Sequence, residues 1–122
     1  MIVAGFGFTS RATADSLRAA LEATGHRGDV TLLAAPRDKA MQPALLDLSK
    51  EMRVMIVAIN DRKLEAAQTR TQSALSRLLR RTGSVAEAAA LAAIKSNARL
   101  ITSRHISKDR QATCAIATGA DT

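Results

Sequence analysis

Aromatic side chains are scarce in this chain, which has two phenylalanines and neither tyrosine nor tryptophan among its 122 residues. Both phenylalanines, Phe6 and Phe8, flank the same glycine. Proteins that bind single-stranded nucleic acid stack successive bases on several aromatic faces, and this chain cannot supply them. No motif of an RNA- or DNA-binding domain is readable either. We therefore expect no nucleic-acid partner.

Cysteine and long hydrophobic runs are also lacking. Cys114 is the only cysteine, so no disulfide can form within the chain, which fits a reducing cytoplasm. The N-terminus shows neither the basic region nor the apolar run of a signal peptide. The longest apolar stretch, from Val85 to Ile94, is interrupted by Glu87 and is too short to span a bilayer. We expect a cytoplasmic protein with no membrane partner.

Recognisable metal and catalytic motifs are missing as well. His26, His105 and Cys114 do not show the spacing of a metal site. No nucleophile, histidine and acid can be grouped from the sequence into a catalytic triad. Cys114 lies in an apolar segment and is expected to be a small buried residue. The sequence thus predicts no metal site and no cofactor, and it assigns no catalytic residue.

The chain does have a strong excess of positive charge. Its net charge is +7, which favours an anionic partner. A small molecule with several carboxylates or phosphates suits this charge as well as a nucleic acid does. Many of the eighteen lysines and arginines are expected to lie on solvated helix faces. The hydrophobic fraction of 47% and the length of the chain predict one globular domain over residues 1–122.

Short apolar segments alternate along the chain with segments of helical periodicity. We expect strands at residues 2–4, 29–34, 54–59, 99–101 and 112–117. We expect helices at residues 10–24, at 38–52, just after residue 60, around 75–79 and from 84 onward, with loops at 68–73 and 102–111. This alternation predicts an α/β fold of three layers, α/β/α, around a mixed, mostly parallel sheet of about five strands. The last strand can be antiparallel, because only a loop precedes it.

In such folds, ligands bind beyond the carboxyl ends of the parallel strands. Four segments follow the expected strands and would meet at that edge: residues 5–10, 38–39, 60–61 and 104–105. The helix that begins at Ser84 could join them. We therefore expect an anion site at this edge.

The glycine-rich segment Gly5-Phe6-Gly7-Phe8-Thr9-Ser10 resembles a phosphate-binding turn only loosely. Ser10 stands where the dinucleotide fingerprint has its third glycine, and no P-loop lysine follows. The two glycines would nevertheless allow close approach to the backbone, and a helix N-terminus offers free N–H groups to an anion. Gly5, Gly7, Thr9 and Ser10 are therefore candidate ligand-binding residues. The alternative is a tight turn in which Thr9 or Ser10 is an ordinary helix cap.

Three further residues have both a structural and a functional interpretation. Ser84 and Glu87 have the spacing of a capping box, which alone would explain them. A carboxylate in an otherwise apolar helix can also have a raised pKa and act as an acid or base. Lys39 is unfavourable near a helix N-terminus, which suggests that it faces a ligand. The alternative for Lys39 is a solvated side chain.

Several motifs together resemble the family formed by CobE and the C-terminal domain of CbiG. The similarity covers residues 82–91 (TGSVAEAAAL), 100–101 (LI) and 112–117 (ATCAIA) in the C-terminal half. In the N-terminal half it covers the Gly5-x-Gly7 segment with Thr9-Ser10, and Lys39 followed by residues 42–45 (QPAL). Arg104 takes the place of the lysine usual in the family after the fourth strand, so the resemblance implies anion binding there too. Phe8 replaces a frequent cysteine, and Gln42 replaces a frequent glutamate.

The resemblance implies a role in cobalamin (vitamin B12) biosynthesis. CbiG members of the anaerobic route open a lactone and release acetaldehyde, and they carry an additional N-terminal domain that this chain lacks. The chain is more similar to stand-alone CobE of the aerobic route. We therefore expect it to bind or hand over a poly-carboxylate corrin or precorrin intermediate, in contact with other corrin-pathway enzymes. A hydrolase acting on a precorrin lactone remains an alternative, as does a generic anion- or nucleic-acid-binding domain.

Overall fold

The computed structural model describes residues 1–71 and 84–120, and within them five strands form one sheet. The strands are β1 (Ile2–Phe8), β2 (Leu32–Pro36), β3 (Ile56–Ile59), β4 (Ser96–Ile106) and β5 (Ala112–Ala120). Their order is β3-β2-β1-β5-β4. β2 pairs in parallel with β1 and β3, whereas β5 is antiparallel to both β1 and β4. All strands but β5 therefore run in the same direction.

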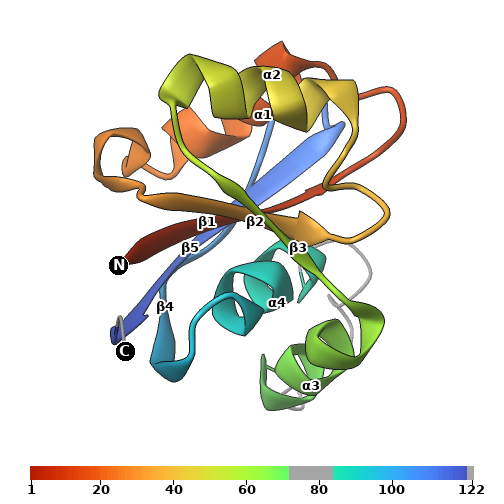
Figure 1. The fold of residues 1–122 in the computed structure, drawn as a ribbon. Helices are drawn as coiled ribbons and strands as arrows, with labels where there is room; N and C mark the ends of the chain where they lie inside the picture. Colours follow the sequence, from red (N-terminus) through yellow and green to blue (C-terminus); the bar gives the residue numbers. More distant parts are fainter. Residues whose placement is uncertain (72–83, 121–122) are drawn as a thin grey trace.

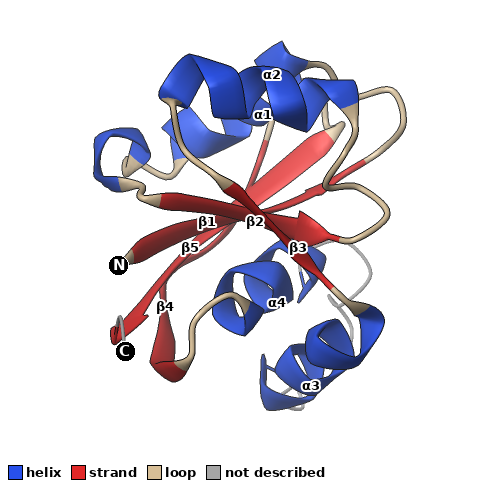
Figure 2. Ribbon diagram, in the orientation of Figure 1, coloured by secondary structure: helices blue, strands red, loops and turns tan. Residues whose placement is uncertain are grey.

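Helices cover both faces of this sheet (Figure 1). They are α1 (Ala14–Ala23), α2 (Pro43–Met52), α3 (Asp61–Thr71) and α4 (Ser84–Ala92), with a short 3-10 helix at Arg27–Asp29. α1 and α2 lie on one face, and α3 and α4 lie on the other (Figure 2). The predicted three-layer α/β/α fold with a mixed sheet is confirmed.

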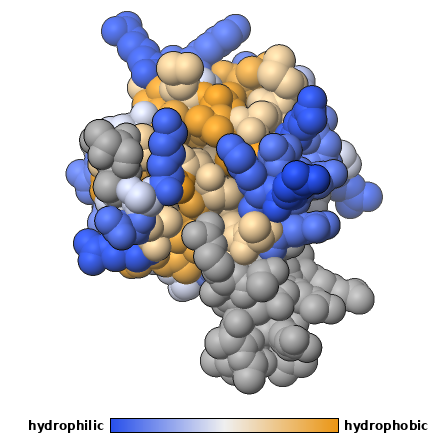
Figure 3. Space-filling view, turned by 60° about the horizontal axis from the view of Figure 1, so that its bottom comes forward, coloured by the Kyte–Doolittle hydropathy of each residue, from blue (hydrophilic) through white to orange (hydrophobic). Residues whose placement is uncertain are grey.

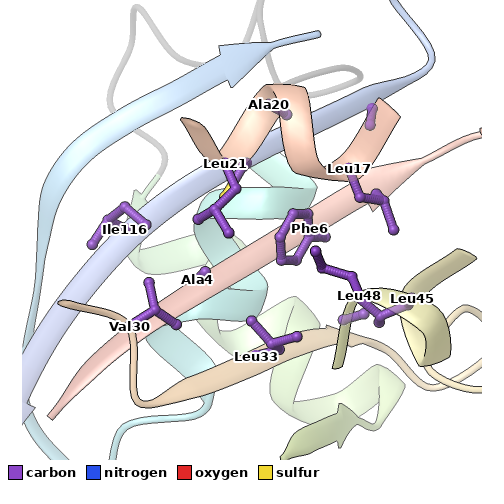
Figure 4. Close-up of a cluster of buried hydrophobic side chains, with 13 residues drawn as sticks. Ala4, Phe6, Leu17, Ala20, Leu21, Val30, Leu33, Leu45, Leu48 and Ile116 are labelled. Atoms are coloured by element: carbon purple, nitrogen blue, oxygen red, sulfur yellow. The ribbon is translucent and has the colours of Figure 1, made fainter. Parts of the chain in front are cut away.

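The two faces of the sheet are packed with different side chains. Under α1 and α2, Phe6 of β1 lies among Leu17, Leu45 and Leu48, and all four are fully buried (Figure 4). Burying a side chain of this size stabilises a fold by about 1.5–3 kcal/mol. On the opposite face, α4 contributes mainly alanines to the core, so its backbone can come close to the sheet.

Gly5 is required by that close approach of α4. A Cβ atom at Gly5 would lie 2.2 Å from the Ala86 carbonyl oxygen and 2.5 Å from the Ala90 amide nitrogen. The expectation that Gly5 ends the first strand is wrong, because β1 continues to Phe8, which is paired with Ala112 of β5. Gly5 is thus a packing residue of the strand.

The first two helices begin later than predicted. Thr13 caps α1: its hydroxyl accepts from the Ser16 N–H at 3.2 Å, and Ser16 Oγ accepts from the Thr13 N–H at 3.1 Å. Thr9 and Ser10 are therefore not its caps. The start expected at residue 38 is wrong: α2 begins at Pro43, which stands at the first helical position, where its missing N–H costs nothing.

Other boundaries differ in the second half of the chain. Asn60 caps α3 as expected, since its Oδ1 accepts from the Lys63 N–H at 2.9 Å. The loop expected at residues 68–73 is wrong up to Thr71, where α3 ends. The loop expected at 102–111 is also wrong for its first half, because β4 runs to Ile106 and only a short hairpin turn remains before β5. The helix expected around residues 75–79 lies outside the described residues.

Apolar side chains also reach the surface. Met41 and Met55 are about three-quarters exposed. In the space-filling view, hydrophobic surface lies between groups of hydrophilic side chains (Figure 3). Across residues 1–71 and 84–120, no helix combines the length and the hydrophobicity needed to span a membrane.

Candidate functional site

A pocket of about 470 Å³ lies at the edge of the sheet where the parallel strands end. Phe8 and Thr9 line it at the end of β1, and Pro36 and Lys39 line it at and after the end of β2. Leu64 of α3, Val85 of α4 and the β4–β5 hairpin complete the wall. Because β1 lies between β2 and β5 in the sheet, these segments surround the carboxyl end of β1. This is the edge at which the sequence predicts a ligand.

Much of the pocket wall is apolar. Phe8, Pro36, Leu64, Val85 and Ile106 all line it. An apolar wall of this extent favours a ligand with a sizeable hydrophobic body.

The absence of a side chain at Gly7 helps to keep the pocket open. A Cβ atom at this position would lie 3.1 Å from Thr113 Oγ1 and 3.3 Å from Val85 Cγ1. Both of those residues line the pocket, as Gly7 does itself. A larger residue at this position would therefore crowd the wall.

Two cations and one carboxylate also line the pocket. Lys39 is half-buried, and its Nζ lies 5.5 Å from the centre of the Phe8 ring, within the range of a cation–π contact. Arg110 and Asp38 are both exposed. Within residues 1–71 and 84–120, neither cation has a side-chain hydrogen bond or ion pair. The pocket therefore offers two positive charges to an anionic group.

The hairpin turn that carries Arg110 is held by the Asp109 carboxylate. Ser107 Oγ donates to Asp109 Oδ1 at 2.5 Å, and the Gln111 N–H donates to the same oxygen at 3.0 Å. Ser16 Oγ of α1 donates to Oδ2 at 2.5 Å. These hydrogen bonds hold the pKa of Asp109 below its ordinary value, with the Ser107 bond contributing most. The turn is thus tied to α1 by an ionised carboxylate.

A second hydrogen bond joins this turn to the end of β1. Thr9 Oγ1 donates to Gln111 Oε1 at 2.5 Å, and the Thr9 N–H donates to the Gln111 carbonyl at 3.0 Å. Both residues line the pocket. Two segments a hundred residues apart in the sequence are therefore fixed next to each other.

The structure brings only some of the predicted site residues to the pocket. Gly7, Thr9 and Lys39 line it. Gly5 lies beneath α4, and Ser10 is exposed beyond the end of β1 without lining the pocket.

The remaining candidates lie near the pocket on α4 and β4. Ser84 begins α4 next to the lining residue Val85, but its side chain is outside the described part of the structure. Glu87 Oε2 accepts from the backbone N–H of Arg104 at 3.2 Å, so this carboxylate joins α4 to β4. The Nε of Arg104 is buried and has no hydrogen-bond partner among the residues that the structure describes. Neither Glu87 nor Arg104 is among the lining residues.

Sequence reasoning missed Arg110, Gln111 and Ile106. All three fall within or next to the segment expected to be an irregular loop, so no position at the pocket could be given to them. Cys114 is fully buried, as expected, and burial raises the pKa of its thiol. It therefore has no role in this pocket.

The family model described as Cobalamin synthesis G C-terminus matches residues 2–117. No curated protein sequence matches the chain significantly.

Solved structures of cobalamin biosynthesis proteins share the fold. Protein chiG from Agrobacterium tumefaciens str. C58 is 29% identical, with a TM-score of 0.74 over 99% of this chain and 100% of that one. CobE, from the cobalamin (vitamin B12) biosynthetic pathway, is 26% identical, with a TM-score of 0.80 over 98% and 91%. A cobalamin biosynthesis protein G homolog from Sulfolobus solfataricus, 20% identical, shares the fold over 96% of this chain and 36% of its own length, with a TM-score of 0.69. Because the family model spans nearly the whole sequence, the chain belongs to the cobalamin synthesis G C-terminal family of cobalamin biosynthesis proteins, the family that its motifs resemble.

Proposed function

We propose that the chain binds a poly-carboxylate corrin or precorrin intermediate of the aerobic pathway, in the cytoplasm, and hands it over to another enzyme of that pathway. The ligand lies in the pocket at the carboxyl end of β1. The observation that carries this proposal is the combination of apolar walls with two cations, Lys39 and Arg110, whose side chains form no hydrogen bond or ion pair in the described part of the chain.

The chemistry of such an intermediate matches both features of the pocket. A corrin macrocycle is a broad apolar body with acetate and propionate side chains at its rim. Phe8, Val85 and Ile106 can contact the body, and Lys39 and Arg110 can pair with the carboxylates. The pocket volume of about 470 Å³ is within the range of roughly 300–1,000 Å³ that is usual for small-molecule sites. The net charge of +7 also favours attraction of a polyanion.

Equilibrium dialysis against cobyrinic acid, a corrinoid whose side chains end in carboxylates, tests the proposal. The corrin absorbance measures bound ligand at physiological salt, and a labelled DNA duplex is titrated in parallel. We expect saturable corrinoid binding and no tight DNA binding. Tight binding of DNA with none of the corrinoid would refute the proposal and favour the generic anion-binding alternative.

Asp38 gives a specific reason to test the hydrolase alternative as well. Opening a lactone requires a base that activates water, and Asp38 is the only carboxylate among the residues lining the pocket. Glu87, the carboxylate that the sequence suggests as an acid or base, does not line it. Incubation with a precorrin lactone should show no turnover if the chain is a carrier. Turnover that is abolished by Asp38→Asn, with binding retained, would instead establish a hydrolase.

A further inference from the structure

Arg110 lies in a backbone conformation that favours glycine. Its φ of 63° is in the left-handed region, where a β-carbon is crowded by the backbone. Hydrogen bonds of the turn impose this conformation: the Arg110 N–H donates to the Ser107 carbonyl at 2.9 Å, and the next N–H, of Gln111, donates to the Asp109 carboxylate at 3.0 Å. None of these bonds involves the arginine side chain. Glycine would therefore fit this position with less strain.

The Arg110 side chain contributes no visible contact that would offset this strain. It is exposed, and no hydrogen bond or ion pair of its guanidinium is present in residues 1–71 and 84–120. It does, however, line the pocket. A strained backbone position that presents an unpaired charge to a pocket is best explained by contact with a ligand.

Lys39 and Arg110 approach the pocket from different sides. Lys39 follows β2, and Arg110 precedes β5. β2 and β5 are the two neighbours of β1 in the sheet, so these cations flank the end of β1 at Phe8 and Thr9. Two separated cations around one pocket can bind two different carboxylates of the same ligand.

We propose that Arg110 is a specificity-determining residue that, with Lys39, selects ligands carrying two free carboxylates over ligands in which these groups are amides. This proposal rests on the proposed function, because it concerns the same pocket. A guanidinium binds a carboxylate through two parallel, charge-assisted hydrogen bonds. A carboxamide carries no charge and presents one acceptor oxygen, so it binds such a group less tightly.

Arg110→Gly separates the two roles of this residue. We expect its melting temperature to equal or exceed that of the wild type, since glycine relieves the left-handed strain. Its affinity for cobyrinic acid should fall by about tenfold or more, the effect of losing one charged hydrogen-bonding partner. Equilibrium dialysis against cobinamide, whose peripheral groups are amides, should show weaker binding to the wild type than cobyrinic acid does. This preference should shrink in Arg110→Gly.

Arg53→Gly is the matched control. Arg53 is also an exposed arginine in the left-handed region, with a φ of 58°. It is the C-cap residue that follows α2, and it does not line the pocket. It should gain or keep stability and retain wild-type affinity. Arg110→Asn provides a second variant, since asparagine also tolerates this conformation.

The outcomes distinguish this inference from the proposed function. If the wild type binds cobyrinic acid and both Arg110 variants bind it equally tightly, the specificity role is refuted while the proposed function stands. If the wild type binds no corrinoid, both are refuted. A melting temperature of Arg110→Gly well below that of the wild type contradicts the strain at this position. In that event, retained affinity in Arg110→Asn overturns the proposal, and lost affinity in folded Arg110→Asn supports the contact with the ligand.

Discussion

On the face covered by α1 and α2, Arg18 and Arg27 both pair with Glu51, whereas at the pocket Lys39 and Arg110 have no acidic partner in the described part of the chain. The Arg18 and Arg27 nitrogens lie 2.5 and 2.7 Å from the Glu51 oxygens. Each of these arginines also pairs with a second acid, Asp15 or Glu22. The same residue types are therefore used in two different ways in one small molecule.

The difference distinguishes positive charges that are paired within the protein from positive charges that are available to the proposed ligand. Hydrogen bonds to Glu51 and Asp15 raise the pKa of Arg18, and the Arg18 bond lowers the pKa of Glu51. Opposite charges in contact cancel each other's field at a distance, so this face contributes little to anion attraction. Unpaired cations keep their field. Lys39 and Arg110 can therefore contribute to attracting the proposed polyanion to the pocket.

Displacing α4 should have the largest effect on the difference between the two regions, because the pocket depends on the position of α4 and the face with the paired charges does not. Gly5→Ala places a Cβ 2.2 Å from the Ala86 carbonyl oxygen, so the backbone of α4 must shift. We expect the free energy of unfolding to fall by about 3 kcal/mol, at the upper end of overpacking effects. Corrinoid affinity should fall too, since Val85 at the start of α4 lines the pocket. Urea denaturation and equilibrium dialysis measure the two effects.

Gly28→Ala is the control for this substitution. Gly28 lies in the 3-10 helix next to Arg27, on the charge-paired side, and no atom lies within 4 Å of a Cβ built there. Its stability and affinity should match the wild type. Equal stability of the Gly5 and Gly28 variants would contradict the close packing of α4 on β1.

Much of this architecture was predictable from local sequence patterns. Alternating apolar segments predict the layers, and Asn60 marks the start of α3, but the start of α2 at Pro43 was expected five residues earlier, at residue 38. The long β4 was not predictable, because an edge strand with polar residues such as Ser103 and His105 lacks a clear apolar alternation. Its extent depends on pairing with β5, which joins residues that the sequence does not show to be neighbours.

The candidate site was predictable to the extent that it depends on strand ends. Lys39 and Thr9 come within a few residues of the end of an apolar segment, so the rule for parallel strands places them at the pocket edge. Arg110 could not be assigned to the pocket from the sequence. Its turn is positioned by hydrogen bonds from Thr9 and Ser16, which lie 102 and 93 residues from their partners Gln111 and Asp109. Nothing in the residues around Arg110 identifies its left-handed backbone either, since that conformation is most typical of glycine.

A matched pair of substitutions compares the loss of one positive charge at the pocket with the loss of one on the charge-paired face. Lys39→Met removes the pocket charge but keeps an apolar chain over Phe8. We expect affinity for cobyrinic acid to fall by about 1–3 kcal/mol, or roughly 5- to 150-fold, with a nearly unchanged melting temperature. Arg18→Met removes a paired charge from the opposite region. It should lower the melting temperature slightly and leave affinity unchanged.

If Lys39→Met and Arg18→Met have the same corrinoid affinity, the proposed difference between the pocket and the charge-paired face is wrong. Equal loss of affinity in both would show that overall charge, rather than the unpaired cations of the pocket, attracts the ligand. Measuring both variants at low and high salt separates these cases, since a long-range effect is screened while a direct contact persists longer.

Glu87 tests whether an acid near the pocket is structural. Its carboxylate accepts from the Arg104 N–H, and the expected cap on α4 would add to this role. Glu87→Ala should therefore lose about 0.5–2 kcal/mol of stability, whereas Glu87→Gln keeps an acceptor oxygen and should lose less. Both variants should retain corrinoid affinity, because Glu87 does not line the pocket. A well-folded Gln variant that abolishes a wild-type turnover would instead favour the hydrolase.

The smallest effect at neutral pH is expected for Asp109→Asn, and it should disappear in acid. Asp109 accepts several hydrogen bonds beside the pocket, and its pKa in the folded chain is below the ordinary value of 3.8. A pKa that is lower in the folded than in the unfolded chain contributes stability at pH values above the unfolded pKa, and this contribution is lost as the pH falls through the folded pKa.

The melting temperature of the wild type should therefore exceed that of Asp109→Asn at neutral pH. The gap should close as the pH falls below 3.8. As a control, Asp47→Asn, at an exposed position of α2 with no described partner, should leave the melting temperature at neutral pH nearly unchanged. Because Asp109 positions the turn that carries Arg110, its loss should also weaken corrinoid binding at neutral pH, which no variant of the paired Arg18–Glu51 group should do. A gap that persists unchanged into strong acid would show that Asp109 acts through its shape rather than its charge.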